Sequence, residues 1–316
     1  MKNSMQNKTN SLVSLGLPVY NGENYIKEAI NSIIKQKYKN WELIISDNCS
    51  TDGTEKICRA YVKKDKRIKY YRYDANRGAA WNYNNCFKLS NGEYFKWAAH
   101  DDNLAPGFLS ECVDVLRNNN DVVLVYPLTY MIDAEGKILK VYSDEAIFNK
   151  LKAHERYRQF FQVYKLRAWC NPIFGLFRRD ILARTVLIGS WLASDLTLLG
   201  EVVLYGKFYQ IDKPLFYQRI HKDNSMQAYN EFERVWWFDP KNLGKPFATH
   251  WRWMKEYISA VKRARLGFKE RILCKWEILR WSFRIKKRLF KEGLRFIFWP
   301  MLKRTKYKDK IRKKFN

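Results

Sequence analysis

Apolar and polar positions along residues 11–130 predict strands and helices in alternation. Short apolar runs bounded by turn residues are typical of buried strands, whereas apolar residues three and four positions apart are typical of helices that pack by one face. The expected strands are 11–20, 41–47, 67–73, 93–99 and 121–127, the first stopping at Pro18, and the expected helices are 24–36, 54–64, 79–89 and 106–118. This order predicts an α/β domain with a largely parallel sheet, in which ligands bind at the carboxyl ends of the strands.

The pattern is looser beyond residue 135. We expect a helix over 153–166, a strand over 172–177, a helix near 194–206 and a strand over 214–221. After about residue 228 the composition changes, and a helical spacing returns over 255–298, carried by Ile272, Trp276, Leu279, Phe283, Phe290, Leu294 and Ile297. We therefore divide the chain into an α/β domain, residues 1–228, and a basic, mainly helical region, residues 229–316.

Two stretches carry polar groups at the ends of expected strands. In "GLPVYNGENY" (16–25), Pro18 lacks an N–H group, which frees the end of its strand for a ligand; an ordinary strand–loop–helix corner has the same pattern. In "ISDNCSTDGT" (45–54), helix capping explains Thr51 or Asp52 but not Asp47 and Asn48. A carboxylate and an amide at a strand end could bind the ring edge of a nucleobase.

Two further stretches contain charged groups at such ends. In "NRG" (76–78), the Arg77 guanidinium could bind a phosphate with two hydrogen bonds, or it could be an exposed loop arginine. In "FKWAAHDDNLAP" (95–106), Asp101 and Asp102 are adjacent, and like charges raise each other's pKa unless a positive group lies beside them. Two oxygen ligands suit Mg²⁺ or Mn²⁺ better than zinc. The alternative interpretation is that one of the two aspartates caps the helix near Pro106.

Taken together, these motifs resemble the family 2 glycosyltransferases, which have the Rossmann-like, nucleotide-sugar-binding glycosyltransferase A fold. The resemblance rests on "PVYNGENY", "SDNCSTDGT", "NRG" and a "DD" pair followed by a proline four positions after its second Asp. It extends to "SDLTLLGEVVLYGKF" (194–208) and "PLFYQRIHKDNS" (214–225), and so covers roughly residues 11–228. Each motif alone is weak, but the set in this order is specific.

The resemblance implies a binding site for a nucleotide sugar and a divalent cation, Mn²⁺ or Mg²⁺. The residues that would bind the nucleotide sugar are Pro18, Tyr20, Asp47, Asn48, Arg77, Gly78 and Asp101. Asp101 matches the second Asp of the family's DxD metal motif, whereas Ala99 occupies the place of the first. The metal ligands would be Asp101, Asp102 and His221, with diphosphate oxygens completing the shell.

The resemblance also implies a catalytic base, Asp195. A sugar hydroxyl is a poor nucleophile, and a positioned carboxylate removes its proton as it attacks the anomeric carbon. Attack opposite the leaving nucleoside diphosphate inverts the anomeric centre, and one carboxylate suffices. Phe174 and Gly175 match a family segment near the acceptor site.

We therefore expect a metal-dependent, inverting glycosyltransferase. Its donor would be a nucleotide-diphosphate sugar, with a UDP-sugar expected first, and its acceptor a glycan or lipid-linked glycan in cell-surface polysaccharide or lipopolysaccharide biosynthesis. The alternative is a catalytically silent nucleotide-sugar-binding module of a membrane-associated assembly complex. The Ala99 substitution favours that alternative, and Asp195 with His221 favours the enzyme.

The remaining features of the sequence concern where in the cell the protein is expected. The six Cys are scattered without a CxxC pair, which is typical of reduced thiols in a cytosolic protein. The N-terminal ten residues lack the apolar stretch of a signal peptide, and no window is apolar for long enough to span a bilayer. We expect a cytoplasmic protein, peripheral at the inner face of the cell membrane.

The basic C-terminal region has three interpretations. Residues 231–316 hold 26 Lys and Arg against 8 Asp and Glu, in a chain of net charge +27. An apolar stripe flanked by basic residues is typical of an amphipathic helix on an anionic membrane, and the charge alone would also suit nucleic acid. We favour the membrane, with no nucleic acid expected, because an enzyme that extends a lipid-linked glycan works at that interface. The third interpretation is that the stripe packs on the α/β domain.

Overall fold

A mixed sheet of nine strands forms the centre of the part of the chain that the structure describes. The structure is a computed structural model, and it describes residues 11–144, 147–164, 170–228, 230–242 and 245–298. The strands are β1 (Val13–Val19), β2 (Trp41–Asp47), β3 (Ile68–Arg72), β4 (Tyr94–Trp97), β5 (Asn103–Leu104), β6 (Val122–Ile132), β7 (Ile138–Tyr142), β8 (Leu176–Arg178) and β9 (Lys207–Arg219). Their order is β3-β2-β1-β4-β8-β6-β9-β5, with β7 paired to β6.

The strand directions divide the sheet into two parts. Strands β3, β2, β1 and β4 are parallel, and every residue of β1 and β2 is buried, as expected where helices cover both faces of a parallel sheet. Strand β8 runs antiparallel to β4 and β6, whereas β9 is parallel to β6 and antiparallel to β5. The predicted parallel arrangement therefore holds for residues 13–97, and the later strands make the sheet mixed.

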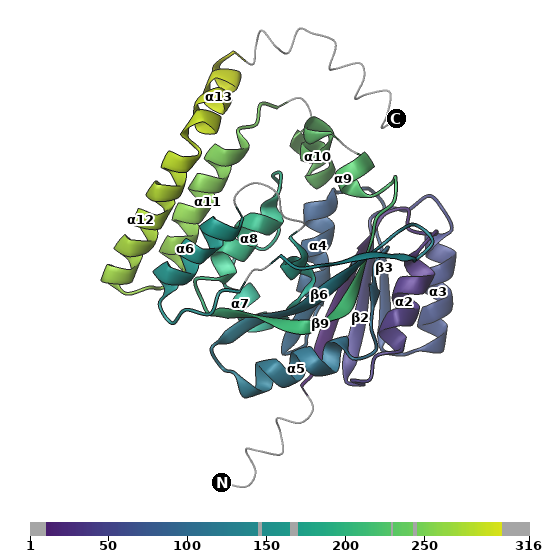
Figure 1. Ribbon diagram of the computed structural model, residues 1–316. Helices are drawn as coiled ribbons and strands as arrows, with labels where there is room; N and C mark the ends of the chain where they lie inside the picture. The colour runs from purple at the N-terminus through teal and green to yellow at the C-terminus, as the bar shows by residue number, and fades with distance from the viewer. Residues whose placement is uncertain (1–10, 145–146, 165–169, 229, 243–244, 299–316) are drawn as a thin grey trace.

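Helices pack on both faces of this sheet (Figure 1). They are α2 (Ile26–Ile34), α3 (Thr54–Lys64), α4 (Ala79–Lys88), α5 (Phe108–Asn118), α6 (Ala153–Val163), α7 (Arg179–Leu182), α8 (Ser194–Val202), α9 (Ser225–Ala228), α10 (Glu231–Phe238), α11 (Thr249–Arg263), α12 (Phe268–Arg284) and α13 (Lys286–Ile297), with 3-10 helices η2 (Asn171–Phe174) and η3 (Pro240–Asn242). One core cluster joins the sheet to α2 and α5, and another joins it to α4, α6, α8, α11 and α12. The predicted α/β fold with a mainly helical C-terminal region is confirmed.

Three predictions after residue 135 are corrected. The segment expected as a strand over 172–177 begins as η2 and becomes β8 only at Leu176, because Pro172 favours a helical first turn and Cys170 before it has a left-handed backbone (φ 58°). The helix expected near 194–206 ends at Val202, and the strand expected from 214 starts at Lys207, where pairing with β6 begins. The helix expected over 153–166 is α6, although residues 165–166 lie outside the described residues.

Strand β1 continues through Pro18 to Val19, where the sequence suggested that it would stop. Pairing of β1 with β4 ends at Gly16, whereas pairing with β2 continues to Val19. The Gly16 carbonyl accepts from Ala98 on the β4 side, and backbone groups two residues apart face the same neighbour. The missing N–H of Pro18 therefore faces the gap beyond the end of β4, where no ladder bond is lost.

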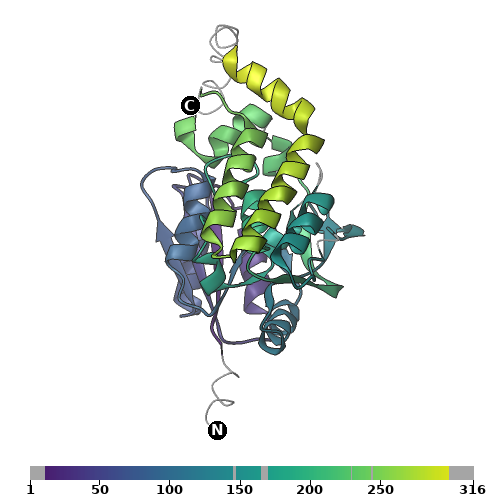
Figure 2. The ribbon, with the colours of Figure 1, turned by 90° about the vertical axis from the view of Figure 1, so that its left-hand side faces the viewer.

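The C-terminal helices share a core with the α/β domain. Trp281 of α12 stacks on Phe161 of α6 with ring centroids 5.3 Å apart, and it meets Tyr257 of α11 edge-on at 5.4 Å. Figure 2 shows α11 and α12 side by side along the domain. Ion pairs of 2.7 Å between Arg263 and Glu201 and 2.8 Å between Arg158 and Glu277 flank the contact. The domain boundary near residue 228 stays a prediction.

The apolar stripe seen in the sequence lies on the opposite, outer face of α12 and α13. Its seven residues, Ile272, Trp276, Leu279, Phe283, Phe290, Leu294 and Ile297, are 39% to 69% exposed. The interpretation in which this stripe packs on the α/β domain is therefore wrong, since the other face of α12, which carries Cys274, Ile278 and Trp281, makes that contact. None of the helices in the described ranges is long and apolar enough to cross a bilayer.

Replacing Trp281 by Ala should lower the free energy of unfolding by about 3–5 kcal/mol, because it removes a large ring from a packed core. Replacing Trp276 by Ala is the matched control, since this ring lies on the same helix and is 56% exposed; it should change stability by no more than about 0.5 kcal/mol. Urea denaturation followed by circular dichroism measures both. Equal effects of the two variants would contradict the packing described.

Candidate functional site

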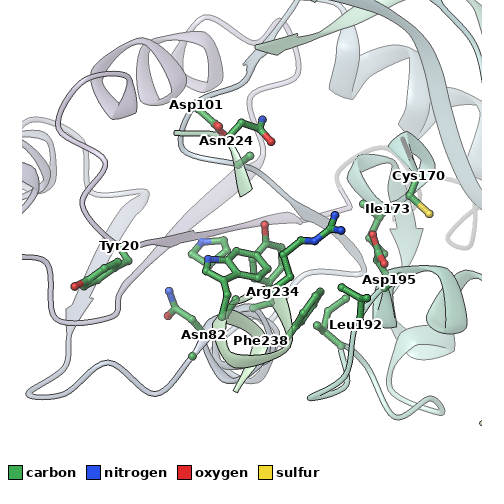
Figure 3. Close-up of a pocket in the computed structure, with 18 of the residues that line it drawn as sticks. Tyr20, Asn82, Asp101, Cys170, Ile173, Leu192, Asp195, Asn224, Arg234 and Phe238 are labelled. Carbon is green, nitrogen blue, oxygen red and sulfur yellow. The ribbon is translucent and has the colours of Figure 1, made fainter. Parts of the chain in front are cut away.

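A cavity of about 1360 Å³ opens at the carboxyl ends of β1, β2 and β4. Pro18, Tyr20, Asn48, Gly78 and Asp101 line one side of it. Asp195 and residues of α10, α11 and α13 line the other side, and Figure 3 shows how side chains from both sides converge. Typical pockets for a single small ligand enclose about 300–1,000 Å³, so this one has room for two substrates at once.

Asn48 organises the corner where the sequence predicts the nucleoside. Its amide nitrogen donates to Asn76 Oδ1 at 2.7 Å, and its amide oxygen accepts from the backbone N–H of Arg77 at 2.9 Å. These bonds join the loop after β2 to the loop before α4. Asn48 thus lines the cavity and also fixes its shape.

Asp47 lies beneath this corner rather than on the cavity wall. It is fully buried, its Oδ1 accepts from the Ser50 N–H at 2.8 Å, and its Oδ2 accepts from the Tyr70 hydroxyl at 2.5 Å. Burial and the Asp47 charge raise the pKa of Tyr70, so its hydroxyl remains a donor. In this structure Asp47 holds the loop, and its predicted contact with a nucleobase stays a prediction.

Gly78 and Arg77 occupy opposite sides of the "NRG" loop. Gly78 has a φ of +86°, and a Cβ there would lie 2.7 Å from the Phe238 carbonyl oxygen, so only glycine fits. The Arg77 guanidinium lies over the rings of Trp81 and Tyr73, at 4.7 and 5.3 Å from their centroids, and pairs with Asp74. Gly78 lines the cavity, whereas Arg77 does not line it.

The aspartate pair is anchored by a residue that the sequence analysis missed, Arg219 at the end of β9. The Arg219 N–H donates to Asp102 Oδ1 at 2.8 Å, and its Nε donates to the Asp101 carbonyl at 3.0 Å. Its remaining nitrogens donate to the Ala134 carbonyl at 2.7 Å and to Glu28 at 2.6 Å. The available signal was an arginine at the carboxyl end of the strand, two positions before His221.

His221 and Asp101 face each other in the cavity, with 3.0 Å between Nε2 and Oδ2. Burial opposes ionisation of Asp101, but His100 and His221 outweigh it and lower the pKa of that carboxyl. Burial and the Asp101 charge raise the pKa of Asp102 well above its usual range. The two carboxyls are therefore unequal, and Asp101 ionises more readily than Asp102.

These residues fit a divalent cation held by few protein ligands. His221 Nε2 and Asp101 Oδ2 lie 3.0 Å apart, close enough for both atoms to be neighbouring ligands of one ion. Asp102 is turned toward Arg219, and no cluster of three or more such ligands occurs among the described residues. Mg²⁺ and Mn²⁺ sites often use one or two carboxylates and complete the shell with substrate phosphates. Asp101 and His221 suit that arrangement better than Asp102 does.

Asp195 lies in the first turn of α8 and faces the cavity (Figure 3). The left-handed residue Ala193 (φ 52°) turns the chain just before the helix. The Leu196 N–H donates to Asp195 Oδ1 at 2.8 Å. Burial raises the pKa of the Asp195 carboxyl, which strengthens it as a proton acceptor. Phe174, but not Gly175, lines the same cavity.

The family follows from comparison with known sequences. The model of glycosyl transferase family 2 matches residues 14–185, more than half of the chain. The chain belongs to this family. The glycosyltransferase is 29% identical over 249 residues to an uncharacterised glycosyltransferase of Rickettsia typhi, covering 73% of this chain and 72% of the relative. It is 28% identical over 236 residues to chondroitin synthase of Escherichia coli, covering 71% of this chain but only 32% of the synthase.

Solved structures show the same fold. S. aureus TarS 1–349 in complex with UDP-GlcNAc matches the glycosyltransferase with a TM-score of 0.64 at 17% identity, covering 91% of this chain and 81% of that one. The mannosyltransferase PcManGT from Pyrobaculum calidifontis, in complex with GDP-Man and Mn²⁺, matches with a TM-score of 0.51 at 15% identity, covering 92% and 88%. The predicted glycosyltransferase A fold is thereby confirmed.

Proposed function

We propose that this glycosyltransferase moves a sugar from a nucleotide-diphosphate sugar to a glycan hydroxyl with inversion, in the synthesis of a cell-surface polysaccharide. The observation that best supports this proposal is that Asp195, Asp101 and His221 line the same cavity as Asn48 and Gly78. Relatives support it: TarS is known with UDP-GlcNAc, and a chondroitin synthase is among the similar proteins. A UDP-sugar is therefore the first donor to test, with a glycan or lipid-linked glycan as acceptor.

In this mechanism Asp195 removes the proton of the acceptor hydroxyl. The oxygen then forms a bond to the anomeric carbon while the bond from that carbon to the diphosphate breaks, and the proton remains on Asp195. Asn48 and Gly78 would hold the nucleoside, and Asp101 with His221 would hold the cation. When bound, Mn²⁺ or Mg²⁺ supplies the positive charge that stabilises the departing diphosphate.

Replacing Asp195 by Asn should lower the turnover number by a factor of about 100 to 10,000, because the general base is removed. Donor binding, measured by calorimetry with UDP-sugars, should persist. In the unaltered enzyme, activity should fall with decreasing pH through a pKa above the ordinary 3.8 of aspartate, since the carboxylate is the active form and burial raises its pKa. Asp180→Asn, at a surface carboxyl 62% exposed, is the control. Normal transfer by the Asp195 variant would remove this residue from the mechanism.

A catalytically silent nucleotide-sugar-binding module is the second candidate, favoured by Ala99 at the position of the first metal-motif Asp. The two candidates differ in turnover. The silent module would bind a nucleotide sugar and neither transfer nor hydrolyse the sugar, with or without Mn²⁺. The enzyme would release UDP.

Calorimetric titration of Mn²⁺ into the full chain with UDP present should show binding. Replacing Asp101 or His221 by Asn should weaken it at least about tenfold, because each would supply a direct ligand. Asp223→Asn is the matched control, since Asp223 lines the same cavity but is not part of the Asp101–His221 hydrogen bond; its titration should be unchanged. Absence of Mn²⁺ binding by the unaltered protein would overturn the metal proposal.

We also propose that the outer face of α12 and α13 binds an anionic membrane surface at the cytoplasmic side. The exposed apolar stripe supports this, with Trp276, Phe283 and Phe290 at 56%, 64% and 67% exposure. Exposed Lys275 and Lys291 flank it, and each basic residue near an anionic surface contributes about 1 kcal/mol. Insertion of the stripe would keep the glycosyltransferase beside lipid-linked acceptors.

The triple replacement of Trp276, Phe283 and Phe290 by Ser should abolish co-sedimentation with vesicles that contain phosphatidylglycerol, because the rings that would enter the lipid are lost. Leu139→Ser, which removes an apolar side chain 54% exposed on β7, is the control and should bind as before. A DNA shift assay on the same proteins tests the nucleic-acid alternative. Equal sedimentation of the triple variant would contradict the membrane proposal.

A further inference from the structure

The C-terminal region supplies one wall of the catalytic cavity, which the sequence did not indicate. Among the described residues, those that line this wall include Arg234, Trp237, His250, Trp253 and Arg288. No described residue of this region that lines the cavity carries a carboxylate. In contrast, Asp101, Asp102, Asp195 and Asp223 all come from outside this region. The wall is therefore aromatic and basic, and it faces a floor that is acidic.

This wall is fixed to the segment that carries the catalytic base. The Trp253 ring N–H donates to the Leu192 carbonyl at 2.9 Å, and Asn242 donates to the Ser190 carbonyl at 2.6 Å. His250 is held by Glu292 of α13, with 2.7 Å between Nδ1 and the carboxylate. Three elements of the C-terminal region thus lie in a defined arrangement beside the start of α8.

The position of the wall assigns it to the acceptor rather than to the donor diphosphate. The donor's phosphates belong with Asp101 and His221, whereas Trp253 contacts the segment just before Asp195, which deprotonates the acceptor. In Figure 3 the side chains of Arg234 and Asp195 both extend into the cavity. A group bound beside these residues would therefore belong to the same acceptor molecule as the hydroxyl that Asp195 deprotonates.

Building on the proposed function, we infer that Arg234, Arg288 and Trp253 form an acceptor subsite for an acidic glycan, with His250 held beside them by Glu292. Guanidinium groups recognise carboxylates and phosphates through paired, charge-assisted hydrogen bonds. An indole face buries the apolar face of a sugar ring at low cost in side-chain entropy. The acidic group is a carboxylate on a sugar or a phosphodiester between sugars, because both have this chemistry.

The inference is tested by binding to the full chain, followed through tryptophan fluorescence, with three probes. These are trigalacturonate, its methyl ester, which has the same skeleton without charge, and a glycerol-phosphate trimer. The acidic probes should bind at least about tenfold more tightly than the ester, and whichever of the two binds better identifies the acidic group. Equal binding of trigalacturonate, its ester and the phosphate trimer would overturn the inference.

Arg288→Gln and Arg234→Gln should each remove most of this preference, because both guanidinium groups line the cavity. Arg284→Gln is the matched control: it deletes the same charge four residues earlier, at the end of α12, where the side chain is exposed and does not line the cavity. Equal losses in the Arg284 and Arg288 variants would show nonspecific attraction to a basic protein and would overturn the inference. UDP and GDP binding measured on the same samples keeps the tests separate: a chain that binds neither nucleotide would count against the proposed function, whereas the comparison of acidic and neutral probes would still decide this inference.

Discussion

The site depends on one buried arginine that joins two distant parts of the chain. Arg219 ends β9, is 1% exposed, and donates to backbone or carboxylate oxygens of Asp101, Asp102, Ala134 and Glu28. A buried guanidinium is stable only when its donors are paired, so the strand end, the aspartate pair and the turn after β6 must assemble together. His221, two residues on, is thereby brought to Asp101. The metal proposal rests on this geometry.

Much of the fold could be predicted from sequence because its first half is built from local patterns. The alternation over residues 11–130 predicted strands β1 to β4 and β6 and the helices between them, since each of these elements buries a face that its own periodicity reveals. The strand positions then placed Asn48, Gly78 and Asp101 at one edge. The prediction failed where tertiary pairing decides the outcome, as in β5, which has two residues, and in β9, whose start is set by β6.

Only part of the candidate site could be predicted from the sequence, because tertiary contacts also decide the role of its residues. The sequence identifies Asp47 as a polar residue at a strand end. It does not show that Ser50 and Tyr70 donate hydrogen bonds to both of its carboxylate oxygens. It divided the C-terminal helices from the α/β domain by composition, although one face of α12 packs on α6 and the other is exposed. No local sequence pattern predicts the cavity wall formed by Arg234, His250 and Trp253, because contacts between residues over 50 positions apart create it.

The close approach at Gly78 limits how this protein can evolve. The Phe238 carbonyl and the Pro240 ring lie 2.7 Å from where a side chain at position 78 would begin. A larger residue there requires a compensating shift in 238–240, and a change in 238–240 is tolerated only if it leaves room for that glycine. Positions 78 and 238–240 should therefore covary among close homologues, so that the loop and the C-terminal region are inherited as a unit and are not freely exchangeable between family members.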